Sequence, residues 1–348
     1  MKRVILIALL LVVSISTVQA QDSADLSGIK DYLQANLVEL QASAVRLETA
    51  AAEYYTLAEA VDFDYEALWS SSRLETITAL LNARDAWLAA SPLYEQVEGV
   101  VAGVPSLSEY DVILDAGASG ADDPEGGVNF DLNLRDGSVL ERPGNLFGVL
   151  ETTLWGTRED YSSGVAADLN LNSEADFGEL LPDADVLVTA AESMRGFTDD
   201  LVADAEAWQP TNEDAFTALV VMVPTMSEYF AAWRDSRFVA GDESTQSDFV
   251  VISRLSDIED ILGGLIVVYD NVSPMVSEVD ATQHQQIDQG LTDLQGYVSE
   301  LYAEERAGRV FTAEEADIFG SEAQGRAQAI TGQIAQVAAL LDITLPEE

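Results

Sequence analysis

The chain has 348 residues, of which 62 are acidic and 16 are basic, and its formal net charge is −46. Such a charge repels nucleic acid and anionic membranes and attracts cations, so we expect no nucleic-acid partner, although an acidic surface also serves solubility alone. Apolar residues make up 48% of the chain, which excludes a disordered composition, and the lack of cysteine excludes disulfides.

The first twenty residues have the pattern of a secretory signal peptide. Residues 1–3 carry positive charge, residues 4–13 form an apolar run too short to span a bilayer, and Val18-Gln19-Ala20 is a small-residue cleavage site. We therefore expect cleavage near Ala20 and a mature protein that is secreted or periplasmic, with no membrane span. The alternative is an N-terminal helix that is retained as an anchor.

Helical periodicity dominates residues 21–103, which we expect to form the N-terminal helical bundle portion. Apolar residues recur at spacings of three and four between residues 29 and 54, which places them on one face of a long helix: Ile29, Leu33, Leu37, Leu40, Ala44, Leu47, Ala51 and Tyr54. A second helix is expected over 65–90, where Pro92 interrupts it, and a third over 94–101.

Residues 104–142 have little helical period and many acidic and glycine residues. The alternation over 129–134, followed by the turn residues 135–138, is compatible with a short β-hairpin. The segment is too long for a plain connector, so we expect an irregular acidic excursion that is either functional or flexible.

The remaining chain returns to helical patterns. Residues 143–182 should hold one helix and a connecting loop, and residues 183–348 a C-terminal helical bundle. Its helices are expected over 183–208, from Thr211 with a kink at Pro224, over 252–272 up to Pro274, over 287–302, and after the capping box Thr312-Ala313-Glu314-Glu315. The predicted fold class is all-α, with two helical-bundle halves.

One segment, PGNLFGVLETTLWG at residues 143–156, resembles the signature of imelysin-like proteins. That signature is a glycine-bearing turn, then Phe-His-x-x-Glu running into Leu-Leu-Trp-Gly. Phe147, Glu151, Trp155 and Gly156 match it, whereas Gly148 stands in the place of the histidine. Residues 86–98 and 256–269 are similar to two further stretches of the family.

The resemblance implies an all-helical protein of two related bundles, located outside the cytoplasm and linked to iron-dependent uptake. Some family members are classified as metallopeptidases because His-x-x-Glu places an imidazole and a carboxylate on one helix face. Here the imidazole is missing, and the single histidine of the chain, His284, lies in an unrelated segment. A catalytic zinc normally needs three ligands rich in histidine, so we expect no enzymatic activity.

Carboxylates can still bind a cation. We expect Glu95, Glu98 and Glu151 to meet at the interface of the two halves, with Asp257 as a fourth candidate. Sites made only of carboxylates suit calcium or iron better than zinc. The alternative for Glu151 is a helix-face carboxylate that meets solvent or Arg158, although its apolar neighbours favour burial and hence a partner.

A second candidate is a calcium-binding loop over residues 168–179. Positions one, three, five, nine and twelve of an EF-hand loop are occupied by Asp168, Asn170, Asn172, Asp176 and Glu179. Ser173 stands where the sharp turn prefers glycine, and Pro182 shortens the exit helix.

Together these features predict a secreted imelysin-like protein that binds a metal cation or a small metal complex in a cleft between two bundles, in iron uptake alongside envelope uptake proteins. The alternative is an envelope interaction module of the same fold that binds no metal.

Overall fold

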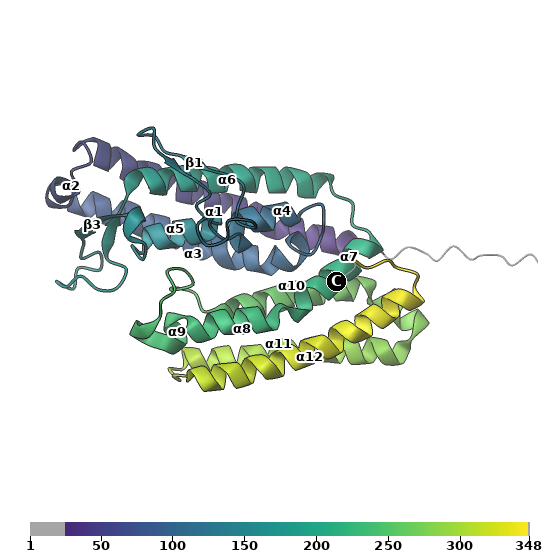
Figure 1. Ribbon diagram of the computed structural model, residues 1–348. Helices are drawn as coiled ribbons and strands as arrows, with labels where there is room; N and C mark the ends of the chain where they lie inside the picture. Colours follow the sequence, from purple (N-terminus) through teal and green to yellow (C-terminus); the bar gives the residue numbers. More distant parts are fainter. Residues whose placement is uncertain (1–24, 347–348) are drawn as a thin grey trace, which may run out of the picture.

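The computed structural model describes residues 25–346 and contains two helical bundles lying side by side (Figure 1). The first bundle consists of α1 (Ser27–Glu59), α3 (Arg73–Val101), α5 (Leu146–Leu154) and α6 (Ala184–Ala207), with the short α2 (Tyr65–Ser71) at one end. Signal-peptide residues 1–20 lie outside the described part of the chain.

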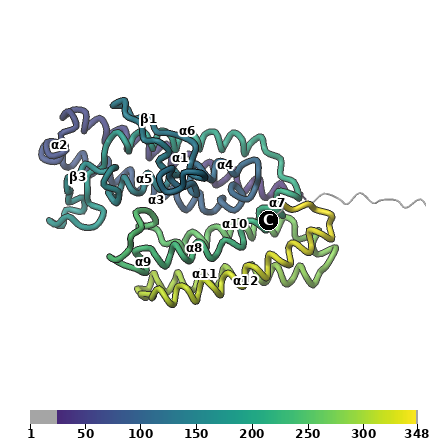
Figure 2. The backbone as a smooth tube through the Cα atoms, viewed as in Figure 1, coloured from purple at the N-terminus to yellow at the C-terminus, as the bar shows by residue number. Residues whose placement is uncertain are grey.

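The second bundle is formed by the helices after residue 211, which Figure 2 shows in green to yellow: α7 (Asn212–Met222), α8 (Met226–Asp235), α9 (Arg237–Ala240), α10 (Arg254–Val279), α11 (Ala281–Arg306) and α12 (Ala313–Leu340). The all-α prediction is thereby confirmed. We placed 183–208 with the C-terminal half, but α6 packs along α1 and α5 and so belongs to the first bundle.

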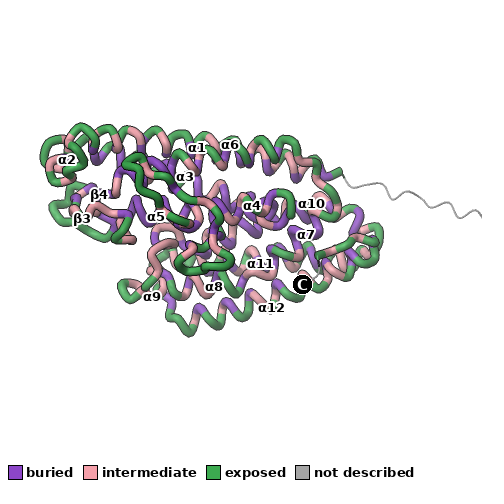
Figure 3. The backbone as a smooth tube through the Cα atoms, turned by 45° about the horizontal axis from the view of Figure 1, so that its top comes forward, coloured by how far each residue is buried: buried purple, intermediate pink, exposed green. Residues whose placement is uncertain are grey.

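The apolar stripes account for the core. All eight residues of the 29–54 stripe are buried in α1, where they face α3 and α6. Figure 3 shows this burial along the inner faces of the helices and exposure along the outer ones. The capping predictions also hold: Thr211 and Thr312 each form a capping box, and Pro224 lies in a 3-10 turn (Val223–Thr225) that separates α7 from α8.

Two prolines do not end helices as we expected. α3 runs through Pro92 and α10 runs through Pro274, whereas the break in the 65–101 region falls at Ser72. A proline removes one backbone donor from a helix. α3 continues to Val101 and α10 to Val279, so packing along these helices outweighs the single lost hydrogen bond.

The segment 104–142 is less irregular than predicted. It opens with α4 (Ser108–Asp111) and a π-helical turn (Val112–Ala116), and its short hairpin pairs β1 (Leu132–Asn133) with β2 (Val139–Leu140), as the alternation predicted. A second hairpin, which we did not predict, pairs β3 (Ser162–Ala166) with β4 (Leu180–Pro182) around the 168–179 loop.

The two bundles meet where α3 crosses α10. A Cβ atom at Gly264 would lie 2.3 Å from the carbonyl oxygen of Gln96, and one at Gly99 would lie 2.8 Å from the side chain of Leu265. Only glycine permits this approach. It brings the α3 turn with Glu95 and Glu98 next to the start of α10.

In the described chain, one helical stretch, Asn212–Asp235, has the length and composition that a membrane crossing requires, with a mean hydropathy of 1.4. It comprises α7, the 3-10 turn and α8, and 56% of its apolar window is buried inside the protein. It packs against α10 and α12, which is how a core helix behaves.

Candidate functional site

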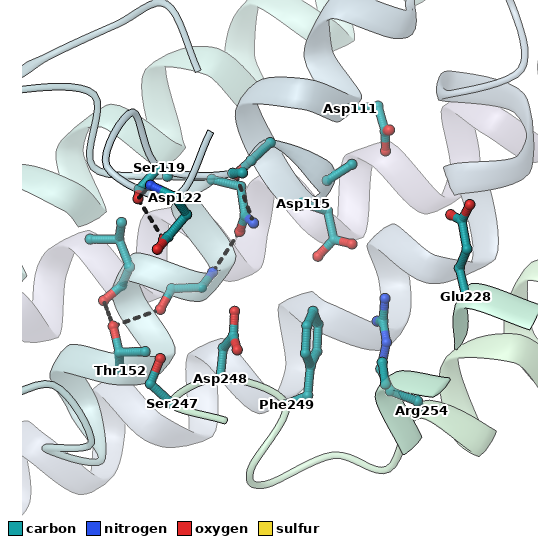
Figure 4. Close-up of a pocket in the computed structure, with 18 of the residues that line it drawn as sticks. Asp111, Asp115, Ser119, Asp122, Thr152, Glu228, Ser247, Asp248, Phe249 and Arg254 are labelled. Carbon is teal, nitrogen blue, oxygen red and sulfur yellow. Dashed lines mark hydrogen bonds between the residues drawn. The ribbon is translucent and has the colours of Figure 1, made fainter. Parts of the chain in front are cut away.

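A cavity of about 540 Å³ lies between the two bundles. Its walls come from α3, from the turn that follows α4, from the start of α5, from α8 and from the loop that precedes α10. Figure 4 shows carboxylates entering it from several of these elements, among them Asp111, Asp115, Asp122 and Asp248.

Three carboxylates at the α3 side of the cavity form a tight group, here called the carboxylate trio: Glu95, Glu98 and Asp115. One oxygen from each lies within 4.8 Å of the others, and no other such group of three acidic or histidine side chains occurs in residues 25–346. Glu95 and Glu98 are one turn apart on α3, and the π-helical turn supplies Asp115.

The trio is buried and incompletely bonded. Glu95, Glu98 and Asp115 are 3%, 2% and 7% exposed. Tyr229 donates a hydrogen bond to Glu98, yet the second oxygen of Glu98 and Oε2 of Glu95 have no hydrogen-bond partner among the described residues. Buried carboxylate oxygens without a donor are unfavourable unless a proton or a cation reaches them.

Arg254 is the buried cation next to the trio. Its Nη1 lies 2.8 Å from Asp257 Oδ2 and 3.9 Å from Glu95 Oε1, and its guanidinium stacks on the rings of Phe249 and Tyr229. Burial alone would lower the pKa of Arg254, but the surrounding carboxylates raise it above its usual value, so the side chain stays charged.

Buried carboxyl groups outnumber Arg254 at this site. Glu95, Glu98, Asp111, Asp115 and Asp257 are all buried around Arg254. Burial, together with the neighbouring carboxylates, raises the pKa of Glu95 and of Asp115 well above the usual range. Burial also raises the pKa of Asp111 to about 7 and that of Asp257 to about 6, although Arg254 opposes both shifts. These shifts favour bound protons on Glu95, Asp111 and Asp115 near neutral pH.

Glu151 is not a member of this trio. Its Oε2 accepts a hydrogen bond from the Phe249 N–H (2.7 Å), and its Oε1 accepts from the N–H groups of Val250 (2.9 Å) and Val251 (3.2 Å). Burial raises the pKa of Glu151 to about 8, although these three donors favour the ionised form. We expected a metal, solvent or Arg158 as its partner; the partner is instead the backbone of the loop before α10.

The other predicted ligands lie near one another. Glu95, Asp257 and Glu151 border a small pocket of about 20 Å³ beside the large cavity, and Gly148 borders both spaces. A Cβ atom at Gly148 would lie 3.1 Å from Asn145 Oδ1 and 3.5 Å from Asp248 Oδ2. A side chain at this position would therefore enter the site.

The rest of the 143–156 motif packs the first bundle. Trp155 and Phe147 make edge-on contacts with Trp87 of α3, whose Nε1 donates to the Phe147 carbonyl at 3.2 Å. Arg84 donates to the Leu154 carbonyl. The 143–156 and 86–98 stretches are thus neighbours in space, and their contact fixes α5 against the α3 turn of the trio.

A family model described as imelysin matches residues 26–343, which is nearly the whole chain. The chain belongs to the imelysin family. A comparison with curated proteins found no match. In this imelysin-family protein Gly148, where the sequence resemblance predicts the motif histidine, borders the carboxylate site and has no side chain to add a ligand.

In this imelysin-family chain, the carboxylates of the 168–179 loop accept hydrogen bonds from the loop itself. Asp168 accepts from the N–H groups of Asn172 and Ser173 and pairs with Arg73. Glu179 accepts from three backbone N–H groups, and the side-chain amides of Asn170 and Asn172 donate to Asp176. The calcium-loop prediction gains no support from this arrangement.

His284 lies in the second bundle, away from the site. Its ring stacks on Tyr269, whose hydroxyl lies 3.1 Å from His284 Nδ1. This contact is a packing arrangement between α10 and α11.

Sequence reasoning missed Asp111, Asp115 and Arg254. Asp111 and Asp115 are four residues apart, a spacing that places two side chains on one face of a helical turn, and Arg254 precedes Asp257 by three residues. Both signals were present, but the first lay in a segment that we expected to be irregular.

Proposed function

We propose that this imelysin-family protein binds an oxygen-preferring cation at the carboxylate trio, as a binding component without catalytic turnover. The observation that carries the proposal is the pair of buried, unpartnered oxygens on Glu95 and Glu98, two residues that form a group with Asp115 in which one oxygen from each residue lies within 4.8 Å of the others. A cation there would satisfy both oxygens and reduce the repulsion within the cluster.

The ligand atoms of the trio indicate which kind of ion it would prefer. Three carboxylates and no nitrogen or sulfur ligand suit calcium, manganese or iron better than zinc. The 540 Å³ cavity borders Glu98 and Asp115, so water can complete the coordination from that side. Arg254 lies closest to Asp257, at 2.8 Å, and 3.9 Å from Glu95, so a single buried cation faces Asp257 and the trio together.

The proposal also includes a location outside the cytoplasm and a part in iron uptake. The signal-peptide pattern of residues 1–20 supports a place outside the cytoplasm, and membership of the imelysin family supports a part in iron uptake with envelope proteins as partners. The family model is also named for peptidases. A metallopeptidase is disfavoured because the site brings no imidazole to the trio, and three ligands rich in histidine are usual for catalytic zinc.

Titration calorimetry on the chelator-treated mature protein tests the proposal, with calcium, manganese and ferrous iron as separate probes. We expect one site for at least one of these ions and an affinity at least tenfold lower in Asp115→Asn, a loss of about 1.4 kcal/mol. Asparagine keeps the shape of aspartate and removes one charge.

The matched control is Asp160→Asn, which removes one charge from an exposed position. It should bind as the parent does. Equal binding by both variants, or no binding by the parent, would favour the envelope interaction module that binds no metal.

A further inference from the structure

The cavity between the bundles is much larger than a metal ion requires. A water molecule occupies about 30 Å³ of liquid, so a divalent ion with six waters fills roughly 180 Å³, well under half of the 540 Å³ available. The space beyond the trio therefore has room for a small organic molecule, since pockets for such ligands usually measure about 300–1,000 Å³.

The charged residues that line this cavity indicate which class of ligand it would bind. Beyond the trio, four further carboxylates line it: Asp111, Asp122, Glu228 and Asp248. None of the four lies within ion-pairing distance of an Arg or Lys side chain among the described residues. Arg158 and Arg254 are the cations in the wall. An anionic ligand would be repelled, whereas an organic cation would replace the missing counter-charges.

The carboxylates are distributed along the cavity. Figure 4 shows Asp122 and Asp248 at one end, Asp111 and Glu228 at the other, and Asp115 between them. Asp115 is 7% exposed, points into the open space and makes no hydrogen bond to the residues drawn. A buried carboxylate without a donor, facing a cavity, is stabilised by a proton or by a positively charged or donor group of a ligand.

Part of the remaining wall is apolar. Val149, Met222, Phe249 and the methyl groups of Ala102 and Ala116 face the same space. A fully hydrated ion gains nothing from such walls, whereas a chain of methylene groups gains by burial there. Exposed Asp122 and Glu228 lie where the cavity meets solvent, so a ligand can enter.

We propose that this cavity binds a linear aliphatic diamine or polyamine, with one ammonium group held by Asp248 and Asp122 and another by Asp111 and Glu228. The methylene groups between them lie along Phe249, Ala102 and Ala116. This site goes beyond the proposed cation site, because its end groups are not members of the trio.

Calorimetric titration of the mature protein with 1,4-diaminobutane and spermidine tests this site, in chelator and about 150 mM salt. Salt at that level screens diffuse attraction to the acidic surface over distances beyond about 8 Å. We expect saturable one-to-one binding, at least tenfold weaker in Asp248→Asn and unchanged in the exposed control Asp160→Asn. Butylamine, which has one ammonium group, should bind at least tenfold more weakly than 1,4-diaminobutane.

A metal titration of Asp248→Asn separates the two proposals, since its trio is intact. Asp122→Asn serves as a second variant, and thermal melts establish that both variants fold. Non-saturable amine binding, equal affinity in Asp248→Asn and Asp160→Asn, or equal affinity for the monoamine and the diamine would overturn the amine site. None of these results would affect a metal site measured independently at the trio.

Discussion

Replacing Glu151 with glutamine should destabilise the protein by about 1–3 kcal/mol, with or without a bound cation. Both oxygens of Glu151 accept hydrogen bonds from backbone N–H groups of residues 249–251, whichever protonation state the carboxyl group adopts. The amide nitrogen of glutamine cannot accept, so one donor loses its partner inside the protein, and a buried unsatisfied donor is costly in either protonation state of the parent.

The reference for this experiment is Glu159→Gln, which makes the same change at an exposed position of the neighbouring turn. It should melt as the parent does. Chemical denaturation of both variants in chelator gives the free energy of unfolding. If Glu151→Gln matched the parent in chelator and differed only with metal present, Glu151 would be a ligand, and the role assigned to it here would be wrong.

The ion-free protein should lose stability as pH rises from 5 to 8, by an amount on the order of 5 kcal/mol. The pKa values of Asp257, Asp111 and Glu151 are raised to about 6, about 7 and about 8, mainly by burial, against 3.8 or 4.5 when unperturbed. Those of Glu95 and Asp115 are also raised. The folded state thus binds more protons than the unfolded state. The stabilisation from these protons is complete below about pH 4 and is lost as the pH rises through the pKa values of the folded state.

Denaturation midpoints across this range in chelator, at low and at high salt, measure the effect. Salt screens repulsion between the exposed acids but not within the buried cluster, so the decline should persist at high salt. A saturating cation should reduce it, because the ion replaces the protons. A stability that is constant or rises between pH 5 and pH 8 would mean that the cluster carries no excess protons.

Much of the fold follows from local patterns in the sequence. The 29–54 stripe predicted α1 because a spacing of three and four residues leaves a helix one face that must be buried. The capping residues Thr211 and Thr312 marked helix starts because their side chains satisfy backbone donors next to them. Such signals involve neighbouring residues, and so they are visible in a single sequence.

The helix ends at prolines were predicted wrongly for a non-local reason. Pro92 and Pro274 lie within long helices whose packing, chiefly between α3 and α10 and against α1 and α11, outweighs the loss of one hydrogen bond. That packing depends on partners far away in the chain. The same reason applies to α6, whose place beside α1 cannot be deduced from its own stripe.

The candidate site was only partly predictable. Glu95, Glu98 and Asp257 were selected as carboxylates of stretches that resemble the family, and the structure does bring them to one interface. Asp115 comes from a turn with no clear helical period. The partners of Glu151 are backbone N–H groups, which every residue except proline carries and which therefore leave no trace in a sequence.

Anomalous diffraction from crystals soaked in manganese is the most direct test of a cation site at the carboxylate trio. We expect one strong anomalous peak bounded by Glu95, Glu98 and Asp115, with carboxylate oxygens from all three residues in its coordination sphere and no such peak in Asp115→Asn crystals. An empty trio beside anomalous peaks confined to exposed acids or to the 168–179 loop would contradict the account.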